Sequence, residues 1–165
     1  MEPLNREEGG WDIARCWLAA MEEAARDFHG TLPKAFCERA YEHATVRWFQ
    51  MLEDQYGITV PRVETIKEAV ESHIEVGVRA GLFRDASQFE LSQVNPQRLE
   101  IKILDCVYRS TCEKLLETGF TIRDLTCARI GCFRASAELL TGIPCKYEVT
   151  GFRADCCCDG FIEHR

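Results

Sequence analysis

The sequence predicts an α+β fold, with N-terminal helices packed on a small, mostly antiparallel sheet and a C-terminal half that runs β-α-α-β-β. Two observations carry this prediction. Apolar residues recur at helical spacing over about the first 81 residues, and near residue 82 the spacing changes to the alternation that is typical of strands. Two alternating segments, each with a turn, then enclose a stretch of helical spacing. We therefore expect four strands in one sheet, with the two late helices on one of its faces.

The length of 165 residues is that of one domain, large enough to bury a single core. We expect residues 1–10 to form a flexible N-terminus and residues 11–165 to form one α+β domain. The helical part of this domain covers about 11–81, and the cysteine-rich α/β part covers about 88–163.

Three helices account for the first part of the chain. The first covers residues 10–30, and the apolar residues on one of its sides are Ile13 or Ala14, Trp17, Met21, Ala24 and Phe28. The second runs from about Pro33 to Tyr56, because proline is common in the first turn of a helix and Gly57 is a typical helix end. The third runs from Pro61 to Gly81, and its apolar stripe comprises Val63, Ile66, Val70, His73 or Ile74, and Gly77.

The remaining elements are two hairpins and two helices. The segments "FELSQV" and "RLEIKILDC" alternate on either side of the turn-forming "NPQ", which indicates a hairpin. Helical spacing returns in "STCEKLLETG" and "IRDLTCARIGCFRASAELLTG", and each segment ends at a glycine, Gly119 and Gly142. The last 21 residues, with "CKYEVTGF" and "CCCDGFIEH", alternate again and predict a second hairpin.

Composition limits the classes of partner. The net charge of −7 argues against a nucleic-acid partner, because phosphate binding needs a basic surface. No apolar run is long enough to span a bilayer, and the acidic start "MEPLNREEGG" is unlike a secretory signal. We therefore expect a cytoplasmic protein that has no membrane partner and binds a small-molecule substrate or ligand, with a homo-oligomer left open.

The ten cysteines are concentrated in the second half, where eight lie between residues 106 and 158. In a reducing compartment such residues are metal ligands, reactive thiols or small buried hydrophobes, and the last interpretation stays open for most of them. Side chains alternate along a strand, so Cys156 and Cys158 share one face and Cys157 points to the other. The predicted ligands of zinc or another divalent metal are Cys127, Cys132, Cys156 and Cys158, with Cys106 and Cys112 as further candidates.

Charged and polar side chains supply the other candidates. Glu148 and Asp159 fall in the last hairpin beside the cysteines, where a carboxylate could move protons for a thiol or a metal-bound water. Alternatively, they are an exposed strand residue and a turn residue. We expect His73 to line a pocket between the third helix and the late sheet, as a lining residue rather than a ligand. The positive neighbours available to a thiolate are Arg129, Arg134 and Arg153.

The segments "LDCVYRSTCEKLLETG", "LTCARIGCFRASAELLTG" and "YEVTGFRADCCCDGFIEH" resemble the C-terminal half of the L-2-amino-thiazoline-4-carboxylic acid hydrolase-like family. This resemblance implies a hydrolase that opens a cyclic amidine or thiazoline-type C–N or C–S bond in a cysteine-rich pocket. The catalytic residues would then be Cys158, Glu148, Asp159 and Cys106. The substrate would be bound by Arg129, Arg134, Arg153 and His73.

The same segments are similar to the 4-vinyl reductase-type ligand-binding domain, a small α/β module that in some sensors holds zinc through cysteines and a glutamate. This second resemblance implies a non-catalytic module that binds a metal or a small ligand. It points to Cys127 or Cys132, Glu148 and Cys158, although Gly151 stands where a further cysteine is expected. A metal or sulfur carrier is a third alternative.

Overall fold

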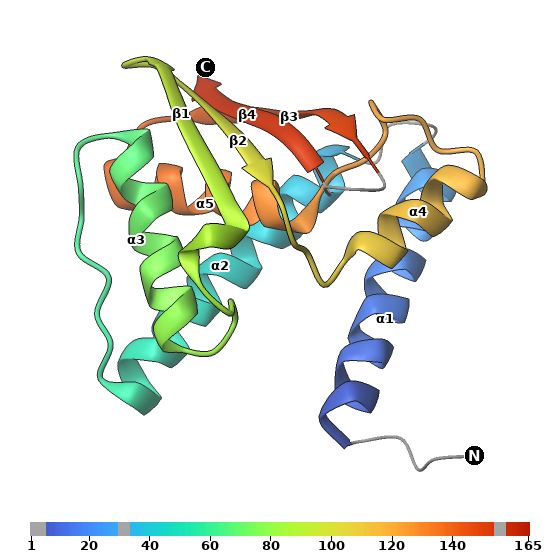
Figure 1. Ribbon diagram of the computed structural model, residues 1–165, viewed down its shortest axis with the longest axis horizontal. Helices are drawn as coiled ribbons and strands as arrows, with labels where there is room; N and C mark the ends of the chain where they lie inside the picture. Colours follow the sequence, from blue (N-terminus) through green and yellow to red (C-terminus); the bar gives the residue numbers. More distant parts are fainter. Residues whose placement is uncertain (1–5, 30–33, 154–157) are drawn as a thin grey trace.

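The computed structural model describes residues 6–29, 34–153 and 158–165, and it confirms the predicted α+β fold (Figure 1). The helices of this part of the chain are α1 (Arg6–His29), α2 (Lys34–Tyr56), α3 (Ile66–Arg79), α4 (Arg109–Glu117) and α5 (Ala128–Thr141), with a short 3-10 helix η1 (Ala86–Gln88). The strands are β1 (Phe89–Asn95), β2 (Arg98–Ile103), β3 (Cys145–Phe152) and β4 (Cys158–His164). None of these helices is long and apolar enough to cross a membrane.

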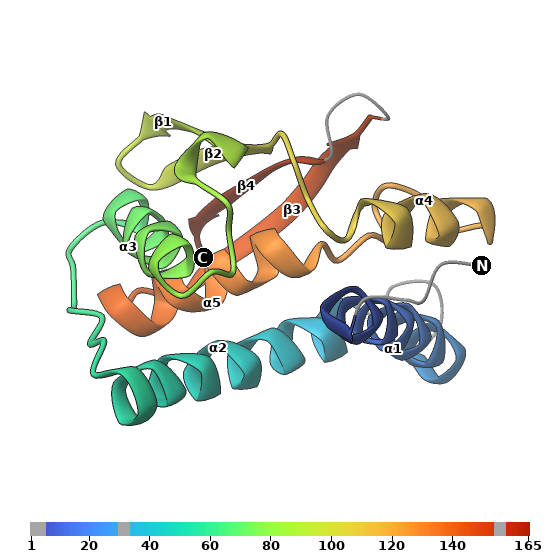
Figure 2. The same ribbon diagram turned by 60° about the horizontal axis from the view of Figure 1, so that its bottom comes forward.

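The four strands form one antiparallel sheet in the order β1-β2-β4-β3. The two hairpins therefore meet at the β2–β4 pair, where Leu99 stands opposite Ile162 and Ile103 opposite Cys158. Helices α3 and α5 lie on one side of the sheet, and α2 lies beyond α5 (Figure 2). The other face of the sheet has no helix from the described part of the chain on it.

Alternation along the strands explains which face is covered. In β2, Leu99, Ile101 and Ile103 are buried, whereas Glu100 and Lys102 between them are exposed. The buried side chains pack against Ile130 and Phe133 of α5 and against the apolar stripe of α3. Each fully buried aliphatic side chain stabilises the fold by about 1.5–3 kcal/mol, so this layer forms the core.

Two helices begin later than the sequence periodicity suggests. Helix α3 starts at Ile66 rather than near Pro61, because Thr65 and Glu68 form a capping box in which each side chain accepts the other's backbone N–H. Helix α5 starts at Ala128, after a turn in which Asp124 accepts the backbone N–H of Thr121. Local hydrogen bonds from short polar side chains therefore stop both helices short of the apolar pattern.

Helix α1 does not bury the apolar stripe predicted for it. Trp17 and Phe28 are 69% and 87% exposed. The buried side of α1 instead carries Ala19, Ala25 and Glu22. Helix α1 is therefore rotated so that the hydrogen-bonded carboxylate of Glu22 and the small alanines face the protein, and the larger apolar side chains face outward.

Candidate ligand-binding site and thiol cluster

A cavity of about 190 Å³ lies between α2, α3 and α5. Its lining includes Trp48 from α2, His73 from α3, Arg129 and Cys132 from α5, and Tyr108 at the start of α4. We call this space the helix cavity. An engineered apolar cavity of about 150 Å³ holds benzene, so the helix cavity has room for one aromatic ring with a small substituent.

His73 lines a pocket as predicted, but this pocket lies between three helices rather than against the sheet. Its Nδ1 is 2.5 Å from Oγ of Ser136 on α5, and its ring lies 4.8 Å from the ring of Trp48 and 5.0 Å from that of Phe133, centre to centre. Burial, helped by the positive charge of Arg129, lowers the pKa of His73 to about 3. His73 is therefore a neutral imidazole near pH 7.

Arg129 brings a buried positive charge to the same cavity. It is the second residue of α5 and is only 7% exposed. The central carbon of its guanidinium lies 4.4 Å from the ring centre of Phe83 and 5.3 Å from that of Tyr108. Among the described residues no carboxylate lies within salt-bridge distance of the guanidinium, and the guanidinium donates no hydrogen bond to them. The cation is held by aromatic faces and aimed at a space of ligand size.

The other two predicted substrate-binding arginines lie elsewhere. Arg134 is fully buried, and its guanidinium pairs with Glu42 at 2.9 Å and Glu138 at 2.6 Å between α2 and α5. Arg153 is half-exposed and pairs with Asp159 at 2.8 Å. Of the three arginines, Arg129 is the one that lines the helix cavity.

A second group of side chains gathers four thiols beside the N-terminus of α5. Cys158, the first residue of β4, is buried and lies within hydrogen-bond reach of Cys112 on α4 and of Cys127. Cys106 is close enough to Cys127 and Cys112 to interact with both electrostatically. We call Cys106, Cys112, Cys127 and Cys158 the thiol cluster. The space beside them is about 10 Å³, which has room for about one water molecule and is too small for an organic ligand.

The thiols of the cluster differ in their pKa values. Cys127 precedes α5 with a φ of +42°, which is rare for a residue with a side chain. Its pKa is lowered, mainly because Cys158 donates a hydrogen bond to it, and the pKa of Cys158 is raised by its hydrogen bonds to Cys112 and Cys127. Burial raises the pKa of Cys106 to about 12. Cys127 therefore ionises more readily than Cys106 or Cys158.

The thiol cluster overlaps only in part with the metal ligands predicted from the sequence. Cys127 and Cys158 come together, whereas Cys132 lines the helix cavity and Cys156, like Cys157, lies outside the described residues. Over residues 6–29, 34–153 and 158–165, no three His, Cys, Asp or Glu side chains are arranged to hold a metal ion. The four soft donors suit a thiophilic metal chemically, but their arrangement does not fit one.

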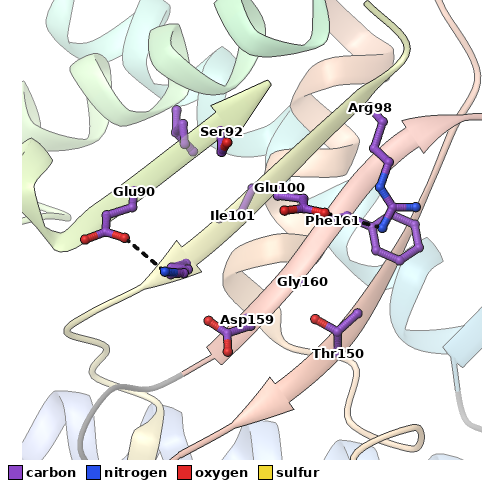
Figure 3. Close-up of a pocket in the computed structure, with 11 residues that line it drawn as sticks. Glu90, Ser92, Arg98, Glu100, Ile101, Thr150, Asp159, Gly160 and Phe161 are labelled. Atoms are coloured by element: carbon purple, nitrogen blue, oxygen red, sulfur yellow. Dashed lines mark ion pairs between the residues drawn. The ribbon is translucent and has the colours of Figure 1, made fainter. Parts of the chain in front are cut away.

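The predicted carboxylates lie on the opposite face of the sheet. Glu148 is exposed there, and Asp159 lines a hollow of about 680 Å³ on this open face, together with Thr150 and Phe161 (Figure 3). Charged side chains in this hollow pair with one another, as Lys102 does with Glu90 at 3.5 Å. The hollow is larger than the helix cavity, but it lies on the sheet surface and its lining includes neither a thiol nor a histidine.

Among the described residues, the carboxylate that lines the small space beside the thiols is Glu22 of α1, which was not among the residues predicted for the site. Its Oε1 accepts hydrogen bonds from the hydroxyls of Tyr41 at 3.1 Å and Thr126 at 2.7 Å, and its buried Oε2 has no partner within the described part of the chain. Burial raises the pKa of Glu22. One signal in the sequence pointed to it: Glu22 lies three residues from both Ala19 and Ala25, on the small-residue side of its helix.

Comparison with known proteins bears on the fold. No protein-family model matches the chain, and a search for similar curated proteins gives no match. The phenol-responsive sensory domain of the transcription activator PoxR, in a crystal structure with phenol, is similar with a TM-score of 0.58 and 14% identity, over 91% of this chain and 74% of that chain. An H-NOX structure from a study of heme distortion covers 100% of this chain and 74% of that chain at 10% identity, but its TM-score of 0.44 is too low to establish a shared fold. The chain thus has the fold of the PoxR sensory domain, and these comparisons do not confirm the hydrolase family.

Proposed function

We propose that the protein is a small-molecule-binding domain whose ligand, a compound with a single aromatic ring, occupies the helix cavity. The observation that carries this proposal is the cavity itself, with room for one ring, aromatic walls that include Trp48 and Tyr108, and buried polar groups that include the charged Arg129. Ligand sites are typically apolar hollows with a few polar groups that fix orientation. The fold shared with a domain that was crystallised with phenol supports the same proposal.

The cavity is tested by blocking it. Ala44 lines the helix cavity and is exposed on α2, so Ala44→Trp adds bulk at the cavity without replacing a buried side chain. The matched control is Ala35→Trp, at an exposed position of the same helix. A panel of single-ring compounds, including phenol, benzyl alcohol, benzamide and benzoate, is then titrated by calorimetry and by thermal unfolding.

We expect at least one compound of the panel to bind the wild type and the control, and to bind Ala44→Trp at least tenfold more weakly. A ligand at ten times its Kd stabilises the folded state by about 1.4 kcal/mol, which raises Tm by roughly 3–6 °C in a domain of this size. A compound that binds Ala44→Trp as well as the wild type would place the ligand elsewhere. Absence of binding by the whole panel would contradict the proposal.

Two other predictions from the sequence stay proposals. A hydrolase would need its carboxylates beside its thiol, and Glu148 and Asp159 lie across the sheet from Cys158. The acid in reach of the thiol cluster is Glu22, which lines the same small space. Binding of zinc or another divalent metal at the thiol cluster is favoured by the four converging sulfurs, and it requires their rearrangement into ligand positions.

A further inference from the structure

We propose that the ligand of the helix cavity is an anion, a single aromatic ring that carries a carboxylate, and that the Arg129 guanidinium binds this carboxylate. The inference rests on the proposed function, because it specifies the chemical class of the ligand in the same cavity. Arg129 is 7% exposed and lines the cavity, and within the described part of the chain its guanidinium has neither a carboxylate partner nor a hydrogen-bond acceptor.

A buried guanidinium without a counterion is unfavourable, because the charge loses its hydration. The cation–π contacts with the rings of Phe83 and Tyr108 offset part of the lost hydration free energy. The guanidinium N–H donors still have no acceptor among the described residues. A carboxylate supplies two acceptor oxygens in the geometry that a guanidinium binds bidentately. An anionic ligand therefore completes the coordination of Arg129.

The other buried arginine of α5 shows how this chain treats a structural cation. Arg134 lies five residues further along the helix and is fully buried, and its guanidinium pairs with both Glu42 and Glu138. The chain thus supplies two carboxylates to the arginine that joins α2 to α5, and none of its described carboxylates to the arginine that faces the cavity. This contrast within one helix distinguishes a packing role from a binding role.

The rest of the lining supports a negative ligand with a ring. No carboxylate of the described residues lines the helix cavity, so nothing there repels an anion. Arg129 also lies in the first turn of α5, where the helix dipole favours negative charge. The rings of Trp48 and His73 lie beside the same space and suit stacking with an aromatic ring. The volume of about 190 Å³ accommodates benzene with one small group.

The test compares two ligands of nearly the same shape, benzoate and neutral benzamide, by calorimetry at pH 7.5. The variants are Arg129→Met, which removes the charge and keeps much of the length, and Arg123→Met, the control at an exposed arginine outside the cavity. We expect the wild type and Arg123→Met to bind benzoate at least tenfold more tightly than benzamide. In Arg129→Met this preference is lost, because benzoate binding weakens at least tenfold while benzamide binding changes little.

The possible outcomes separate this inference from the proposed function. Equal binding of benzoate and benzamide by the wild type overturns the anionic ligand and leaves a neutral ligand of the helix cavity in place. An unchanged preference in folded Arg129→Met overturns the role of Arg129. Failure of the whole single-ring panel to bind overturns both proposals. The comparison of benzoate and benzamide binding by the wild-type protein needs no variant. It therefore tests the anionic ligand even where Arg129→Met does not fold.

Discussion

His73 makes the stability of this protein sensitive to mild acid. Its pKa falls from 6.5 in the unfolded chain to about 3 in the fold, because the imidazole is buried beside Arg129. As the pH falls below 6.5 the unfolded state takes up a proton that the folded state does not. The contribution of neutral His73 is therefore complete above pH 6.5 and is lost progressively as the pH falls toward 3.

The size of the effect follows from the same two values. At pH 5, about 1.5 pH units below the pKa of His73 in the unfolded chain, protonation of this histidine favours the unfolded state. The effect is roughly 2 kcal/mol, at 1.36 kcal/mol per pH unit. This is a large part of the stability of an ordinary domain, which is about 5–15 kcal/mol. The substitution His73→Gln removes the titration and keeps a polar side chain that can bond to Ser136.

The assay is urea unfolding followed by circular dichroism at pH 7.5 and pH 5.0. Other titrating groups, including Glu22, are common to both proteins, so the difference between wild type and variant isolates His73. We expect the stability advantage of the wild type over His73→Gln to shrink by about 2 kcal/mol between the two pH values. His43→Gln, at an exposed histidine of α2, should follow the wild type. An advantage that stays constant within about 0.5 kcal/mol would refute the reasoning.

Two further predictions concern packing and metal. A Cβ at Gly131 would lie 2.2 Å from Cδ2 of Tyr41, because α2 and α5 approach closely there. Gly131→Ala should therefore lower the free energy of unfolding by about 1–3 kcal/mol, and an unchanged urea midpoint would contradict this close approach. A metal site at the thiol cluster implies that protein purified without chelator holds about one ion per chain. Cys158→Ser should lose this ion and Cys16→Ser, at an exposed thiol of α1, should keep it; metal-free wild-type protein would contradict the site.

Much of the fold could be predicted because its signals are local. In the part of the chain that the structure describes, the helices and the strands of both hairpins are visible as changes in the spacing of apolar residues, and the antiparallel pairing of β1 and β2 follows from the short turn between them. The stripe of α3 also places His73 on a buried side. The prediction fails at helix starts where a capping residue ends the helix inside the apolar pattern, as Thr65 does at α3.

The site was only partly visible for a different reason. The sequence indicated that Cys158 and a helix cysteine belong together, and alternation along β4 with the α5 contact brings Cys158 to Cys127. It offered three arginines without distinguishing them, since all three are equally charged in an unfolded chain. Their roles differ through carboxylates that are distant in sequence: Glu42 is 92 residues from Arg134.

By itself, then, the sequence determined the fold class, the order of elements, the two hairpins and the concentration of thiols near the last strand, because these depend on neighbours within a few residues. Only the tertiary structure decided that α1 turns Glu22 inward and Trp17 outward, and that Glu148 and Asp159 lie across the sheet from the thiols. It also decided that Arg129 faces a cavity with no counterion from the described residues. Burial and charge pairing decide these features, and both depend on which distant elements pack together.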